Sequence, residues 1–198
     1  TLQVVQELYE KKMVTYPRTD ARVLSTAVAK EIYKNISGLK NYSICSAFAS
    51  EILEQGSYKG IAKTRYVNDK QITDHYAIIP TGQGLNNLNS LNPTAAKVYE
   101  TICRRFLSIF YPPAVYQKVA ITTGIKSEKF FSNFKVLSEE GYLNVMQYSF
   151  FQKNQESNEA KEKDGKDTKS TEENEEIKCD EQFMELLKSL KKGDTLAL

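Results

Sequence analysis

Apolar residues in the first half of the chain recur every three or four positions, the spacing typical of an amphipathic helix. Four segments show it, namely residues 2–12, 25–37, 43–55 and 92–110. We expect Gly38 to end the second helix, because glycine readily takes the left-handed conformation that follows a helix. Short helices joined by short turns predict a compact helical domain, and a helix-turn-helix or winged-helix arrangement fits this pattern.

The pattern changes to a two-residue period after the prolines at 112 and 113. Residues 115–122 and 130–136 are predicted to form two antiparallel strands, and residues 142–150 are expected to form a third. Proline cannot continue a helix, so a domain boundary is predicted there. The two predicted domains are residues 1–112 and 113–198. The predicted fold class is therefore α+β.

Residues 152–178 are polar, charged and nearly free of apolar side chains. Such a segment cannot bury enough apolar surface to offset its ordering entropy, which predicts a disordered acidic loop. A short amphipathic helix at residues 183–190 and a strand at 195–198 are expected to follow. The strand is expected to return to the β-rich domain, and both ends suggest a piece of a longer protein.

Charge is distributed unevenly along the chain. The formal net charge is +2, but residues 152–181 hold eleven acids and six bases, so the remainder is strongly basic. A basic body suggests a polyanionic partner. There is no run of about 18 apolar residues that predicts a membrane span, and no secretory leader. The three cysteines lack CxxC spacing, which indicates neither a zinc site nor a disulfide framework and suits a reducing cytoplasm.

The segment from Met13 to Asp20 gathers a tyrosine, an arginine and an aspartate around a proline. The proline biases Tyr16 away from helical backbone, so its phenol stands on a rigid segment close to Arg18. A phenol must be activated to act as a nucleophile at neutral pH, and the planar guanidinium suits phosphate. The alternative interpretation is a core tyrosine beside an arginine at a turn.

The only histidine of the chain, His75, opens the segment His-Tyr-Ala-Ile-Ile-Pro-Thr. A lone histidine is more often structural than catalytic, so this residue alone decides nothing. Further basic residues are candidates for contacts with a nucleic-acid backbone, although the same pattern fits an ordinary solvated surface. These candidates are Lys59, Lys63, Arg65, Arg104 and Arg105.

Two motifs together resemble the type IA DNA topoisomerases. Tyr16-Pro17-Arg18-Thr19-Asp20 resembles the family's active-site segment, and the segment opened by His75 resembles its second signature. The isoleucine pair before Pro80 resembles the topoisomerase III branch. The run Arg104-Arg105-Phe106 before the two prolines resembles the helix that closes this domain. Ala21 and Tyr76 depart from the residues common in the family, without touching the tyrosine, the arginine or the histidine.

The resemblance implies a role for each motif residue. Tyr16 would attack a phosphodiester of single-stranded DNA, leaving a 5′-phosphotyrosyl bond and a free 3′-hydroxyl without using ATP. Arg18 would hold the scissile phosphate, and His75 would contact a phosphate and position the strand. Thr15 and Asp20 would lie at the DNA, and Asp20 would orient Arg18 or cap the helix that follows.

The resemblance also implies what surrounds this chain. Its fold would be a tyrosine-bearing winged-helix-like (CAP-like) domain followed by part of the β domain of the topoisomerase arch. Mg²⁺ would be held by a Toprim domain outside these residues, and the fragment itself would bind no metal. The implied partners are single-stranded DNA and the missing Toprim and arch domains. The implied fragment is monomeric, inactive alone, not membrane-bound, and drawn from a cytoplasmic, nucleoid-associated bacterial enzyme.

Three other interpretations of the residues stay open. The chain could be a winged-helix module that binds DNA without any chemistry. It could be part of a tyrosine recombinase, although that chemistry needs clustered arginines with histidine around the phosphate. It could also be an interaction scaffold in which the acidic segment is the active part.

Overall fold

The computed structural model describes residues 1–150 together with residues 189, 191 and 193. These residues fall into two units. The first comprises Thr1–Pro113 and the described residues within Gly141–Gly165, and the second contains Ala114–Glu140 and the described residues that come after Gly165. The predicted acidic loop and the predicted strand at 195–198 lie outside the described residues, as does the predicted helix at 183–190 apart from Ser189.

Within the described residues, four α-helices build the first unit, and all four match segments predicted from the apolar spacing. They are α1 (Leu2–Glu10), α2 (Thr26–Leu39), α3 (Ser46–Gln55) and α4 (Pro93–Ser108). Short 3₁₀ helices connect them at Ser57–Lys63, Asp69–Gln71 and Leu85–Ser90. Side-chain caps fix the starts of α2 and α4: Ser25 Oγ accepts from the N–H of Val28 at 3.2 Å, and Asn92 Oδ1 accepts from the N–H of Ala95 at 2.8 Å.

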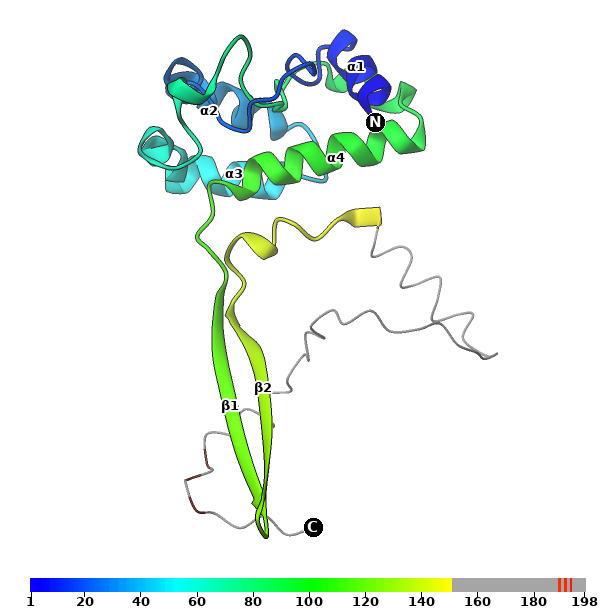
Figure 1. Cartoon of the computed structure of the whole chain (residues 1–198). Coiled ribbons are helices and arrows are strands. Elements are labelled where there is room, and N and C mark those ends of the chain that lie inside the picture. Colours follow the sequence, from blue (N-terminus) through cyan, green and yellow to red (C-terminus); the bar gives the residue numbers. More distant parts are fainter. Residues whose placement is uncertain (151–188, 190, 192, 194–198) are drawn as a thin grey trace, which may run out of the picture. The chain divides into compact units, whose positions relative to one another are not determined.

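One apolar core joins these helices. Figure 1 shows α4 running along one side of the group formed by α1, α2 and α3. Leu8 of α1, Ile32 of α2, Ile52 of α3 and Leu107 of α4 all bury their side chains in this core. Because each helix presents one apolar stripe, burial of these stripes against one another is the main force that holds the unit together.

Gly38 does not end α2, contrary to the prediction. The helix continues to Leu39, and the glycine is needed for a close approach instead. A Cβ atom on Gly38 would lie 2.2 Å from the carbonyl oxygen of Gly82, so no larger residue fits without moving the backbone. This contact, together with a 2.8 Å hydrogen bond from Asn35 Nδ2 to the Pro80 carbonyl, fastens α2 to the segment that follows His75.

The second unit contains an antiparallel hairpin. Strand β1 (Val115–Ile125) pairs with β2 (Glu128–Glu139), with Val119 opposite Phe134. The two strands predicted after the proline pair are thereby confirmed. Several large apolar side chains on the hairpin are exposed, among them Phe131 at 72%.

The third predicted strand, at residues 142–150, is wrong. Gly141–Leu143 forms a 3₁₀ helix, and the residues after it join the first unit. Val145 is fully buried in the core of that unit, and its carbonyl accepts a hydrogen bond from Arg104 at 2.9 Å. Apolar residues at short spacing suggested a strand here, but their partners are core side chains and not a neighbouring strand.

None of the described helices has both the length and the apolar character that crossing a bilayer requires.

Candidate active site

Backbone pairing brings the two sequence motifs side by side. The N–H of Thr15 donates to the carbonyl of Ile79 at 3.0 Å, and the N–H of Thr81 donates to the carbonyl of Met13 at 3.0 Å. Between these bonds, Val14 forms an antiparallel bridge with Pro80. Tyr16 and His75 are about 60 residues apart in the sequence, and the fold makes their segments neighbours.

Two threonine hydroxyls reinforce this pairing. Thr15 Oγ1 donates to the carbonyl of Ala77 at 3.3 Å and accepts from the N–H of Ile79 at 3.0 Å. Thr19 Oγ1 donates to the carbonyl of His75 at 2.8 Å. The hydroxyl of Thr15, which the sequence placed at the DNA, is therefore already used twice within the protein, and both threonines fix the histidine segment against the tyrosine segment.

Tyr16 lies between two aromatic rings. Its ring centroid is 4.5 Å from that of His75, at an interplanar angle of 45°. On another side, Tyr9 of α1 meets it edge-on, with centroids 5.4 Å apart and an angle of 81°. Tyr16 is half-buried and His75 is exposed. The sequence did not single out Tyr9, whose position at the end of an amphipathic helix marked it only as part of an apolar face.

A depression of about 450 Å³ opens beside His75. Its lining consists of Arg18, Thr19, Asp20, Thr73, Asp74 and His75. Arg18 is exposed, and it has no ion pair with any side chain that the structure describes. A free guanidinium next to an imidazole at the rim of a depression is suited to hold a phosphate.

Asp20 has neither of the structural roles expected for it. The cap of α2 comes from Ser25, and no ion pair joins Asp20 to Arg18 within the described residues. Its carboxylate instead lines the depression together with Asp74. The reason is local: Ser25 stands directly before the helix, where its short hydroxyl reaches the backbone N–H of Val28.

Arg104 corrects the sequence interpretation of the arginine pair on α4. Its side chain is buried, with Nε donating to Glu100 Oε1 at 2.7 Å and Nη1 donating to the Val145 carbonyl. A guanidinium used in this way is not available to DNA. The sequence signal for this ion pair was Glu100, which lies four residues before Arg104. This spacing places both side chains on one helix face. Arg105 is exposed, as expected.

The remaining basic candidates lie away from Tyr16. Lys59, Lys63 and Arg65 are exposed, but none of them lines the depression or the neighbouring cavity that includes Tyr9 and Tyr16. Arg65 stacks over the ring of Tyr66, with its central carbon 5.2 Å from the ring centroid. The structure therefore gathers Tyr16, Arg18, Asp20 and His75, whereas the three other basic candidates lie elsewhere on the surface.

The magnesium ion implied by the resemblance finds no ligand set in this part of the molecule. Mg²⁺ prefers several oxygen ligands in octahedral geometry. Among the residues that the structure describes, no group of three or more His, Cys, Asp or Glu side chains could hold a metal. The depression offers only two carboxylates, with a guanidinium beside them, and this lining does not fit Mg²⁺.

Comparison with known proteins supports the resemblance. A family model described as DNA topoisomerase matches residues 1–192. The chain is 34% identical over 203 residues to DNA topoisomerase 3 of Bacillus subtilis and 32% identical over 199 residues to that of Bacillus licheniformis, covering 100% of this chain and 23% of each relative. DNA topoisomerase 3 of Bacillus cereus strain ATCC 14579 is 29% identical over 202 residues.

The chain thus spans about a quarter of the length of these relatives, since it covers 23% of two of them and 24% of the third. The family match includes both motifs and continues through the hairpin. This chain belongs to the DNA topoisomerase family.

Proposed function

We propose that this chain is the nucleophile-bearing part of a type IA DNA topoisomerase of the topoisomerase III branch. The observation that carries the proposal is the pairing of the two motif segments, which puts the ring of Tyr16 4.5 Å from that of His75. Arg18 and His75 line one exposed depression, and the nucleophile is next to it through the contact of the Tyr16 ring with His75. Phosphoryl transfer needs such positioning and charge stabilisation more than it needs covalent chemistry from the protein.

In the proposed step, the phenol oxygen of Tyr16 attacks the phosphorus of a phosphodiester in single-stranded DNA. A phosphorus–oxygen bond forms to the tyrosine, and the bond from phosphorus to the 3′-oxygen breaks. The phenol loses its proton and the 3′-oxygen gains one, so charge and atoms balance. The reverse attack by the 3′-hydroxyl reseals the strand, and no ATP is needed because the phosphotyrosyl bond stores the energy.

The surrounding residues fit supporting roles. Arg18 holds the scissile phosphate and stabilises the negative charge that develops on it. His75 donates a hydrogen bond to a phosphate oxygen, and Tyr16 and His75 keep their spacing through the hydroxyls of Thr15 and Thr19. The acidic cluster and the Mg²⁺ site belong to the Toprim domain of the full-length enzyme, where the metal would contribute charge neutralisation at phosphate.

The architecture is part of the same proposal. Residues 1–112 correspond to the tyrosine-bearing winged-helix-like, CAP-like domain, and the hairpin β1–β2 belongs to the β domain of the arch. The full-length enzyme is proposed to be a monomer that acts at the bacterial nucleoid in the cytoplasm. By opening a single strand transiently, it would relax or decatenate DNA.

The decisive experiment is capture of the covalent intermediate. The full-length protein is incubated with Mg²⁺ and a single-stranded oligonucleotide labelled at its 3′ end, and the reaction is stopped with denaturant. We expect the label to migrate with the protein, because a 5′-phosphotyrosyl bond retains the downstream fragment. Tyr16→Phe should give no adduct while preserving both ring contacts.

Tyr33→Phe serves as the matched control, because Tyr33 is an exposed tyrosine on α2. An adduct that persists in Tyr16→Phe would refute the nucleophile assignment. Equal binding of duplex and single-stranded DNA without any adduct would favour the alternative, a winged-helix DNA-binding module without catalysis.

A further inference from the structure

A smaller cavity, of about 250 Å³, lies next to the segment that follows His75, because Ala77–Ile79 form part of its wall. Its lining is mostly apolar and comes from three extended segments and from α4. The extended segments contribute Arg22, Leu24, Tyr66 and Ala77–Ile79, and α4 with the residue after it contributes Thr101, Ile102, Arg105, Phe106 and Ile109. None of the proposed catalytic residues lines this cavity.

The extended walls are held together by backbone hydrogen bonds. The N–H of Ala77 donates to the carbonyl of Val23 at 2.9 Å, and the N–H of Leu24 donates to the carbonyl of Tyr66 at 2.8 Å. The N–H of Asn68 then donates back to the carbonyl of Leu24 at 3.0 Å. Because these bonds fix all three segments, the cavity is preformed and does not depend on a ligand to shape it.

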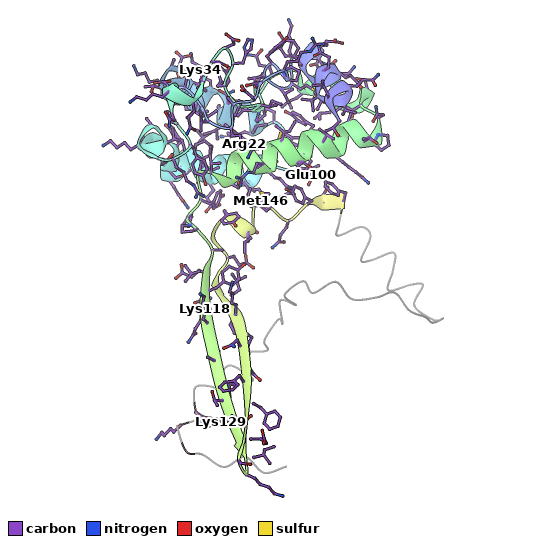
Figure 2. All side chains as sticks on the ribbon, in the orientation of Figure 1. Arg22, Lys34, Glu100, Lys118, Lys129 and Met146 are labelled. Atoms are coloured by element: carbon purple, nitrogen blue, oxygen red, sulfur yellow. The ribbon has the colours of Figure 1, made fainter. Side chains whose placement is uncertain are left out.

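The charged groups at this cavity are all positive. Arg22 and Arg105 are exposed, and the lining contains no carboxylate. Figure 2 labels Arg22 beside α4, the helix that carries Arg105. Neither guanidinium forms an ion pair with a residue that the structure describes. An apolar recess flanked by free guanidinium groups suits a ligand with a flat apolar part and an anionic part.

We infer that this cavity takes one unstacked nucleobase of single-stranded DNA, and that Arg22 and Arg105 contact the phosphates on either side of it. The inference rests on the proposed function and adds a binding subsite to it. The volume lies below the range of roughly 300–1,000 Å³ typical of drug-sized ligands, which suits a single base. Tyr66 provides an aromatic surface on which a base can stack.

The cavity is also fixed relative to the nucleophile. Thr15 Oγ1 bonds to the backbone of Ala77 and of Ile79, and both residues line the cavity. Tyr16 follows Thr15 directly, so the base-binding wall and the phenol move as one piece. A base held in the cavity would therefore set the register of the strand at Tyr16.

The first test removes the two charges. The full-length protein carrying Tyr16→Phe is titrated with a fluorescently labelled single-stranded oligonucleotide at several salt concentrations. Adding Arg22→Ala and Arg105→Ala should weaken binding at least tenfold at low salt. The slope of the logarithm of affinity against the logarithm of salt concentration should become shallower by about 1.4. Each phosphate contact on a single strand contributes roughly 0.7 to this slope.

The matched control removes the same charge elsewhere. Lys34 and Lys40 are exposed at α2, outside this cavity, and Lys34→Ala with Lys40→Ala should change affinity less than twofold. Equal weakening by the two double variants would overturn the inference, because charge alone would then explain the loss.

The second test asks whether a base enters the cavity. Oligonucleotides with one abasic nucleotide, moved stepwise past the cleavage position, are titrated against the same protein. One abasic position should weaken binding about tenfold, because stacking of one base accounts for a change of this size. Thr101→Phe should fill the exposed mouth of the cavity and remove this sensitivity, whereas Thr101→Ser should keep it.

The two proposals fail in different ways. Suppose that affinity does not depend on the position of the abasic nucleotide, while the protein with Tyr16 still forms the covalent adduct. This result would overturn the base-binding cavity alone. Absence of single-stranded DNA binding by the Tyr16→Phe protein would overturn the proposed function as well. Sensitivity that persists in Thr101→Phe would place the stacked base somewhere other than this cavity.

Discussion

At the scale of single residues, the candidate site is defined by how Tyr16 is held. The hydroxyl performs the proposed attack, while the ring is fixed by His75 at 4.5 Å and by Tyr9 at 5.4 Å. Pro17 is buried next to it, so the backbone at the nucleophile is anchored as well. The reactive group thus has little freedom to move away from His75, which lowers the entropic cost of reaching the phosphate.

We predict that Tyr9 positions Tyr16 through its ring. An edge-to-face pair is worth about 0.5–1.5 kcal/mol beyond its buried area, so Tyr9→Ala should slow single-turnover cleavage by roughly two- to tenfold. Tyr9→Phe should cleave at nearly the original rate, since it keeps the ring edge. Single-stranded DNA affinity should change less than twofold in both variants of the full-length protein. A loss of affinity equal to the loss of rate would assign Tyr9 to DNA binding instead.

At the scale of elements, the segment after the hairpin is fastened to α4 by a buried polar network. Figure 2 labels Glu100 on α4 and Met146 on this segment. The Glu100 carboxylate accepts from Arg104 Nε at 2.7 Å, from the Ser149 N–H at 2.8 Å and from Ser149 Oγ at 2.6 Å. Burial alone would raise the pKa of Glu100, but the hydrogen bonds from Ser149 and Arg104 outweigh it and leave the pKa lowered.

This network predicts a specific pH dependence of stability. Because the pKa of Glu100 is lower in the folded chain, the ionised carboxylate stabilises the fold above its ordinary pKa of 4.5, and this contribution is lost as the pH falls through the folded value. Glu100→Gln should therefore lower the free energy of unfolding at pH 7 by about 1–3 kcal/mol. The difference from the unmodified chain should shrink below about pH 4.

Urea unfolding followed by circular dichroism measures this difference. Glu54→Gln is the matched control, because Glu54 is an exposed carboxylate on α3 without a hydrogen bond in the described part of the chain. A deficit of Glu100→Gln that stays constant from pH 7 to pH 3 would contradict the assigned role of the charge.

Periodicity predicted the elements better than it predicted their partners. All four α-helices and the strand pair followed from apolar spacing, because each of these elements is amphipathic by itself. The segment 142–150 was misjudged because its partners, Glu100 and Arg104, come from α4 and not from a neighbouring strand. Burial of Arg104 could have been suspected from the glutamate four residues earlier.

The candidate site, too, was predicted only in part from the sequence. The motifs named Tyr16, Arg18 and His75, but only the folded chain shows that Thr15 and Thr19 join the two segments. Tyr9 was hidden because an aromatic residue on an amphipathic helix usually belongs to the core. The cavity beside Arg22 could not be predicted from the sequence either, since its walls come from four segments that are distant in sequence.

At the scale of the whole molecule, the chain supplies the nucleophile of the proposed reaction and groups that surround it. Its described residues supply a phenol, a guanidinium and an imidazole, and the same residues hold no cluster that fits a metal. The relatives that it matches are about four times as long, since the chain covers 23% of them. Phosphoryl transfer depends on simultaneous stabilisation of the attacking and leaving oxygens, which the groups around Tyr16 alone do not provide.

We therefore predict that the 198-residue chain by itself binds single-stranded DNA but does not relax a supercoiled plasmid. Binding should persist because Arg18, Arg22 and Arg105 are exposed and unpaired by side chains in the described part of the chain. It should weaken steeply with salt, as phosphate contacts do. Agarose-gel relaxation of a negatively supercoiled plasmid with Mg²⁺, with the full-length protein as the positive control, measures the activity. Robust relaxation by the isolated chain would show that the leaving oxygen is stabilised by residues within it, and the assignment of the acid and the metal to another domain would then be wrong.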